Sequence, residues 1–130
     1  MALDLLNSVD RPNVGLLIDC FHWYTSHAGV DDLMELAPEQ VVYVHVNDAI
    51  AGVDVDEQLD DVRRLPGVTR VIDLVGFLQA LDRVGYDGPV AVEPFDASLA
   101  AIPPGERVRL AAQSLRGAFD AAHLVVQAGC

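Results

Sequence analysis

Three short apolar runs have the length of β-strands, at residues 14–18, 41–46 and 89–93, and they alternate with segments of helical character. They are rich in Val and Leu, as in strands that are covered on both faces. Strands that alternate with helices form parallel sheets, because each helix returns the chain in a right-handed crossover. The pattern predicts an α/β fold with about three parallel strands and four helices.

The four predicted helices are recognised by apolar residues at helical intervals or by residues typical of a helix start. They cover residues 3–9, 31–36, 73–85 and 103–127. The polar stretch 47–70 contains Gly52, Pro66 and Gly67, and it is longer than an ordinary connection. Loops of this length are usually functional or disordered.

The chain is strongly acidic, with 20 acidic and 8 basic residues and a formal charge of −12. Such a surface repels phosphate backbones and anionic membranes, so we expect neither nucleic acid nor a membrane as a partner. A role in solubility or salt adaptation explains this charge more simply than the steering of a cationic ligand. The N-terminus lacks a basic, apolar leader and the chain has two cysteines, from which we expect a cytoplasmic protein.

A polar residue able to bind a metal stands at the end of each predicted strand: Asp19, His45 and Glu93. Parallel strands bring these ends to one face, which is where (β/α) barrels carry their catalytic residues. Each residue alone has a structural explanation, as a helix cap, a turn former or a hydrogen-bonded histidine. Together, two carboxylates and an imidazole suit Mn²⁺, Zn²⁺, Co²⁺ or Mg²⁺.

Four motifs in register resemble the last three strands of the sugar phosphate isomerase/epimerase family, the xylose isomerase-like barrels. The resemblance runs from about Leu3 to Phe95. The motifs are Asp19-Cys-Phe-His22, His45-Val-Asn-Asp48, Arg64-Leu-Pro-Gly67 and Gly85-Tyr-Asp-Gly-Pro-Val-Ala-Val-Glu93. The resemblance implies the C-terminal part of a TIM barrel, with residues 1–130 as a single domain.

The resemblance implies that Asp19, His45 and Glu93 match three of the family's four metal ligands. It also implies that Glu93 is the catalytic base. The fourth ligand, a glutamate on the preceding strand, has no counterpart in residues 1–130. A site with three protein ligands can still be catalytic, because catalytic metals often keep an open position.

Other residues acquire roles only through the same resemblance. His22 matches a catalytic histidine that contacts substrate oxygens, and either Arg64 or Arg63 matches an arginine that faces the substrate. A solvated loop charge is the alternative for the arginines. Asp48 is expected either to orient His45 as a partner behind the metal ligands or to form a turn.

Four further aromatic or histidine residues are noted without a firm role. Phe21 and Trp23, which flank His22, could wall a pocket, although core packing is the commoner fate of aromatic side chains. His27 and His123 have no motif behind them. The chain also reads Leu-Pro-Gly-Val-Thr-Arg at residues 65–70, where the family usually has Glu or Asp and Gly after Pro-Gly, so the loop is expected to close differently.

The family's chemistry implies an isomerase or epimerase that acts on a small keto sugar, inositol derivative or hydroxy-keto acid through an enediolate. The alternative is a truncated, non-catalytic barrel fragment or interaction subunit with a vestigial metal site. A DNA-repair endonuclease of the same barrel ancestry is disfavoured, because this chain lacks a basic surface.

A complete (β/α)₈ barrel needs about 250 residues, and this chain has 130. Three parallel strands cannot close into a barrel, so they leave two edges and one apolar face exposed to water. We therefore expect the partial barrel to be completed by oligomerisation. A homodimer needs no unseen partner, and a separate N-terminal barrel half is the alternative.

Overall fold

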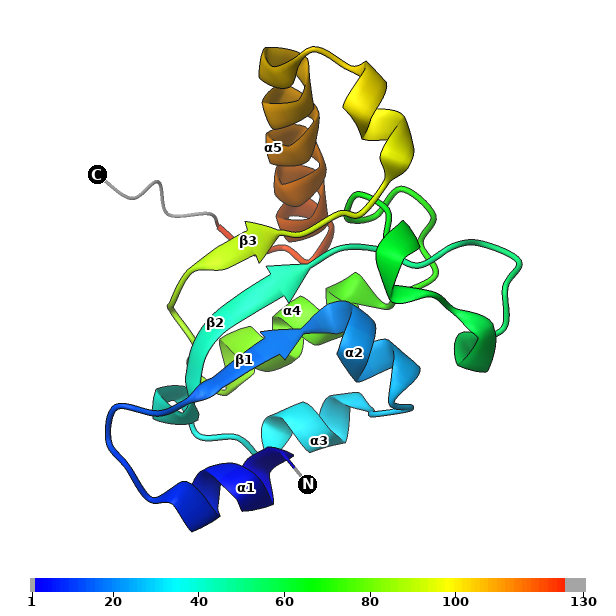
Figure 1. Cartoon of the computed structure of the whole chain (residues 1–130). Coiled ribbons are helices and arrows are strands. Elements are labelled where there is room, and N and C mark those ends of the chain that lie inside the picture. The colour runs from blue at the N-terminus through cyan, green and yellow to red at the C-terminus, as the bar shows by residue number, and fades with distance from the viewer. Residues whose placement is uncertain (1, 126–130) are drawn as a thin grey trace.

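The computed structural model describes residues 2–125 and contains one three-stranded parallel sheet (Figure 1). Strand β2 lies between β1 and β3 and pairs in parallel with both. The elements are α1 (Ala2–Val9), β1 (Leu16–Asp19), α2 (Cys20–Thr25), α3 (Val30–Met34), β2 (Val41–Val46), α4 (Leu74–Arg83), β3 (Val90–Val92) and α5 (Pro104–Ala121). Four short 3₁₀ turns are η1 (Pro38–Gln40), η2 (Val55–Glu57), η3 (Asp60–Val62) and η4 (Ala97–Ala101). The predicted partial barrel of parallel strands and helices is confirmed.

The described residues contain five α-helices, where the sequence pattern predicts four. The additional helix is α2, which is only six residues long and rich in aromatic residues of middling helix propensity. Its start is stabilised by Asp19, whose Oδ1 accepts hydrogen bonds from the backbone N–H groups of Phe21 (2.8 Å) and His22 (3.4 Å). A helix this short depends on its cap more than on a periodic pattern.

Several element boundaries also differ from the prediction, most of them by one or two residues. Strand β1 begins two residues later than expected and includes Asp19, so this carboxylate belongs to the strand rather than to the loop after it. Helix α5 ends at Ala121, before the predicted end at residue 127, and residues 126–127 lie outside the described residues. No helix within residues 2–125 is long and apolar enough to cross a membrane.

One face of the sheet is covered by helices, and the hydrophobic core lies there (Figure 1). Val44 and Val46 of β2 are fully buried in the same core as Phe77 of α4. Asp73 caps the start of helix α4, and its side chain accepts a hydrogen bond from the N–H of Gly76 (3.0 Å). It is followed by Gly85 at φ +85°, a conformation that glycine adopts without strain.

The other face of the sheet would form the inside of a complete barrel. Leu17, which is paired in register with Tyr43, is 51% exposed on this face. Tyr43 packs edge-on against His45, with 5.3 Å between the ring centroids. Within residues 2–125, β1 and β3 each have one unpaired edge, as the sequence predicts for a sheet of three parallel strands.

The connection between β2 and α4 is organised around the buried side chain of Asp48. Its carboxylate accepts hydrogen bonds from five backbone N–H groups, which belong to Ala49, Thr69, Arg70, Val71 and Ile72. The backbones of Asp48 and Arg64 also exchange two hydrogen bonds of 2.7 and 2.9 Å. The connection is therefore an ordered loop that closes around Asp48.

Replacing Asp48 with Asn is expected to destabilise the fold. In either orientation of the Asn side chain, its NH₂ group would replace a carboxylate oxygen that accepts from at least two backbone N–H groups. A donor would then face donors, and these N–H groups would lose their acceptor. We expect a loss of about 2–4 kcal/mol in the free energy of unfolding, measured by urea denaturation.

The control for this change is Asp54→Asn. Asp54 caps η2 at the surface and accepts one hydrogen bond from Asp56, a role that Asn fills equally well. We expect the control to lose less than about 0.5 kcal/mol. Equal losses in the two variants would contradict the anchoring role of Asp48.

Candidate metal centre

The strand register brings the three predicted ligands together at the carboxyl end of the sheet. Asp19 of β1 is paired with His45 of β2, and His45 is paired with Ala91 of β3. Side chains alternate along a strand, so Glu93 follows Ala91 on the same face as His45. One ligand atom from each of Asp19, His45 and Glu93 lies within 4.8 Å of the other two.

The distances within this cluster fit a divalent cation. His45 Nδ1 lies 3.1 Å from Glu93 Oε2 and 3.6 Å from Asp19 Oδ2. Bonds of 2.0–2.2 Å to a common metal separate neighbouring ligand atoms by about 3.0–3.6 Å. Asp19, His45 and Glu93 would therefore be the residues that hold the metal implied by the family.

The two oxygens of Asp19 have different partners. Oδ1 caps α2 and also accepts a hydrogen bond from the side-chain amide of Asn47 (3.3 Å). Oδ2 is the oxygen that faces His45 and Arg63. The helix cap thus fixes the orientation of the carboxylate and leaves its second oxygen directed into the cluster.

Arg63 contributes a buried guanidinium to the same cluster, with a side chain only 3% exposed. Its Nη1 donates to Asp19 Oδ2 and to Glu93 Oε2, both at 2.8 Å. Its Nε donates to Asp60 Oδ1 at 3.1 Å, its Nη2 also contacts Asp60, and Nη2 lies 3.0 Å from His22 Nε2. The arginine connects the strand ends with the η3 turn.

Burial and charge act in opposite directions on Arg63. Burial alone lowers its pKa, but the hydrogen bond to Asp60 and the charges of Asp19, Asp60 and Glu93 outweigh burial and raise the pKa above its ordinary value. The guanidinium also lies over the rings of Phe21 and Phe95, at 4.9 and 5.0 Å from the centroids. These contacts hold it as a cation in a buried place.

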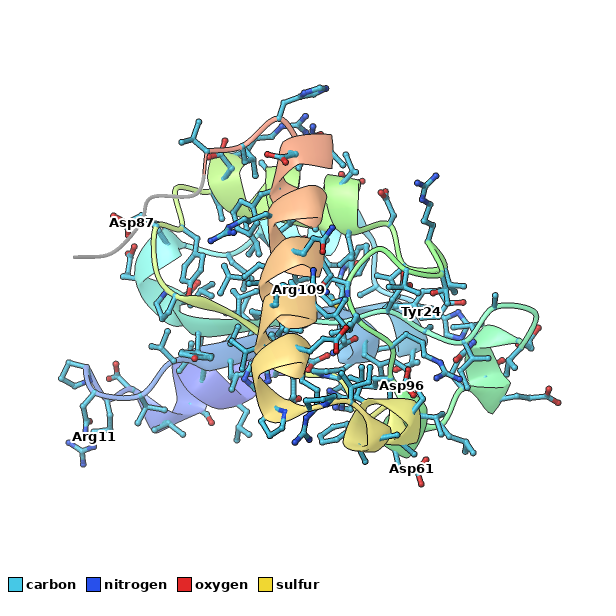
Figure 2. The ribbon with its side chains drawn as sticks, turned by 90° about the horizontal axis from the view of Figure 1, so that it is seen from above. Arg11, Tyr24, Asp61, Asp87, Asp96 and Arg109 are labelled. Atoms are coloured by element: carbon cyan, nitrogen blue, oxygen red, sulfur yellow. The ribbon has the colours of Figure 1, made fainter. Side chains whose placement is uncertain are left out.

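The structure separates the two arginines that the sequence leaves as alternatives. Neighbouring side chains of an extended backbone point in opposite directions, and only Arg63 reaches the strand ends. Arg64 instead forms an ion pair of 2.7 Å with Asp96, the residue before η4 that is labelled in Figure 2. His22 lies at the rim of the cluster, 3.5 Å from Asp60, with 63% of its side chain exposed.

The expectation that Asp48 orients His45 differs from the observed contacts. Both oxygens of Asp48 accept from backbone N–H groups of the loop, so the turn alternative describes its position.

Trp23 packs against Phe77 of the core, with 5.3 Å between ring centroids. Phe21 is buried, but its ring also supports Arg63.

Two remaining histidines lie away from the cluster. His27 Nε2 lies 2.7 Å from Asp56 at the surface. His123 is exposed just after α5, with a φ of +59°. Neither histidine belongs to the group that could hold a metal.

Sequence reasoning assigned no site role to Asn47, Asp60 or Phe95. Asn47 is fully buried and orients Asp19, while Asp60 and Phe95 hold Arg63. Asn47 stands within a recognised motif, which is a usable signal. Asp60 is one of several acids in the loop, and nothing in its spacing distinguishes it from its exposed neighbours.

Comparison with known proteins agrees with the parallel α/β fold. The family model described as "Xylose isomerase-like TIM barrel" matches residues 1–118. The chain belongs to this family. Its three parallel strands with their helices are part of that barrel.

Three curated relatives illustrate the range of the family. The chain is 33% identical over 103 residues to 3-dehydroshikimate dehydratase of Pseudomonas aeruginosa, covering 78% of the chain and 16% of that protein. It is 28% identical over 113 residues to inosose isomerase of Bacillus velezensis, covering 87% and 40%. It is 30% identical over 100 residues to ketose 3-epimerase of Arthrobacter globiformis, covering 77% and 30%. The chain thus spans less than half the length of each of these relatives.

A solved structure of the family has the same arrangement of elements. The crystal structure of the IOLI protein with a bound zinc atom superposes with a TM-score of 0.83 at 26% identity. The match covers 93% of this chain and 42% of that one. The fold of residues 2–125 therefore corresponds to a part of a longer barrel chain.

Cys20, next to Asp19, is expected to be chemically inert in the folded protein. Burial raises the pKa of its thiol well above the usual range. The hydrogen bond from the Asn47 N–H lowers this pKa, but its effect is smaller than that of burial. In a Cys130→Ser variant, which keeps Cys20 alone, a thiol reagent at pH 8 should react at least about 100-fold more slowly than in the urea-unfolded chain. Equal rates would show that Cys20 is accessible.

Proposed function

We propose that this chain carries part of the active site of a metal-dependent isomerase or epimerase. The single observation that carries the proposal is the convergence of Asp19, His45 and Glu93 within 4.8 Å at the carboxyl ends of the strands. Catalytic residues of (β/α) barrels stand at this end. The zinc in the IOLI structure supports a divalent metal here, with Mn²⁺, Zn²⁺, Co²⁺ and Mg²⁺ as the candidates.

The proposed substrate is a small keto sugar, an inositol derivative or a hydroxy-keto acid. The curated relatives named inosose isomerase and ketose 3-epimerase support this class. A bound divalent cation supplies polarisation of a carbonyl and its neighbouring hydroxyl. The other steps fall to the side chains of the chain itself.

Glu93 is the proposed base that removes the proton next to the carbonyl and so forms the enediolate. It is partly exposed, with 35% of its side chain accessible, so a substrate can reach it. An isomerase returns the same proton to the adjacent carbon, whereas an epimerase needs a second group on the opposite face. Isomerisation is therefore the reaction that the described residues support with the fewest groups.

His22 and Arg63 are the proposed groups that bind substrate oxygens. His22 is exposed at the rim, and its Nε2 lies beside the guanidinium of Arg63. Both lie next to the metal ligands, where an oxyanion develops during enolisation. Arg63 can donate to a substrate oxygen only after one of its N–H groups leaves its present acceptor. Arg64 has no place in this proposal, because Asp96 engages it elsewhere.

The alternative function is a non-catalytic barrel fragment or interaction subunit with a vestigial metal site. The exposed Leu17 face and the unpaired edges of β1 and β3 favour an assembly in either case. We propose that a second copy covers this face, with a separate N-terminal barrel half as the other candidate. A cytoplasmic location stays a prediction.

Metal content tests the proposed centre. Protein purified without chelator is expected to contain about one Mn, Zn or Co per chain by elemental analysis, because three ligands suffice for a catalytic site. Glu93→Ala should lose most of this metal, since it removes a charged ligand. Glu39→Ala, which changes an exposed glutamate of η1, is the matched control and should retain it.

Light scattering on the same samples gives the molar mass and so tests the homodimer. A metal-free protein that is indifferent to Glu93→Ala would contradict the metal centre and leave the non-catalytic alternative. A monomer would contradict the proposed second copy without affecting the metal result.

Proton exchange tests the chemistry without knowledge of the natural substrate. Wild-type protein with Mn²⁺ in D₂O is expected to incorporate deuterium next to the carbonyl of an accepted keto sugar or inosose, detected by ¹H NMR. Glu93→Gln should slow the exchange by at least about 100-fold, because it removes the general base and one charged metal ligand. Exchange that is as fast in Glu93→Gln would exclude Glu93 as the base.

A further inference from the structure

The oxygens that would bind the metal also bind Arg63. Asp19 Oδ2 and Glu93 Oε2 are the two carboxylate oxygens nearest His45 Nδ1. The same two atoms accept hydrogen bonds of 2.8 Å from Arg63 Nη1. A metal bonded to these oxygens at about 2.0–2.2 Å would take up the space and the lone pairs that Nη1 uses.

We propose that Arg63 is an internal cation that competes with the divalent metal for Asp19 and Glu93. Metal binding then requires Nη1 to leave both carboxylates. This inference rests on the metal centre of the proposed function and adds a coupling between metal binding and the position of the loop that carries Arg63.

The rest of the arginine has partners that allow such a move without exposing its charge. Nε and Nη2 contact Asp60 and His22, whereas Nη1 contacts Asp19 and Glu93. The rings of Phe21 and Phe95 also contact the guanidinium, at 4.9 and 5.0 Å from their centroids. A small rotation or shift of the guanidinium would release Nη1 while the contacts with Asp60 persist.

The charges of the cluster also favour displacement over expulsion. Asp19, Glu93 and Asp60 are three carboxylates around one guanidinium, which leaves two negative charges in excess. One divalent cation would balance this excess while Arg63 stays paired with Asp60. The displaced Nη1 would then lie next to the metal, where it can donate to a substrate oxygen.

Calorimetric titration with Zn²⁺ tests the competition. Arg63→Gln is expected to lower the Kd for Zn²⁺ at least tenfold relative to wild type, because it removes the competing donor. The matched control is Arg64→Gln, which removes the same charge from the adjacent position. The native Arg64 pairs with Asp96 and not with the proposed metal ligands. The control should change the Kd by less than threefold, since it affects only the long-range field.

A second measurement on wild-type protein covers the case in which Arg63→Gln does not fold. The ¹⁵N NMR signal of the Arg63 Nε–Hε group is expected to move when Zn²⁺ binds, because the guanidinium changes its contacts. The Nε–Hε signal of Arg64 serves as the internal reference and should stay in place.

The results separate this inference from the proposed function. Tight Zn²⁺ binding with an equal or higher Kd in Arg63→Gln, or an unmoved Arg63 signal at saturation, would overturn the competition and leave the metal centre intact. Absence of Zn²⁺ binding in wild type and both variants would overturn both. Binding by Arg63→Gln and not by wild type would support the competition in its strongest form.

Discussion

The buried carboxylate of Asp48 accepts hydrogen bonds from five backbone N–H groups, and the long connection between β2 and α4 depends on it. A buried carboxylate without donors is costly, so the loop must close around Asp48 when the chain folds. The backbone bridge between Asp48 and Arg64 then fixes the strand-like segment at residues 63–64. Arg63 is positioned over the strand ends as a result.

The cluster at the strand ends is held together by opposite charges. Asp19 and Glu93 lie close enough to share one hydrogen-bond donor, Arg63 Nη1, and two ionised carboxylates at that spacing repel each other unless a cation lies between them. Protein and metal can both meet this need. The same arrangement of oxygens would also suit a divalent ion.

The open face of the sheet connects the fold with the assembly of the protein. A (β/α) barrel buries its inner side chains by closure, and three strands supply only part of that enclosure. Leu17 and Tyr43 lie on the face that other strands cover in a complete barrel. The described strand ends therefore correspond to one part of the barrel wall in the longer relatives.

The sequence by itself determined the parallel α/β architecture, because buried strands and amphipathic helices have distinct periodicities. It also indicated Asp19, His45 and Glu93, since polar residues at the ends of apolar strands are conspicuous. Only the tertiary structure placed Arg63 at the strand ends and Arg64 beside Asp96, and assigned Asp48 to the loop rather than to His45. These choices depend on contacts between residues far apart in the chain, such as Arg63 with Asp19, and local patterns carry no information about them.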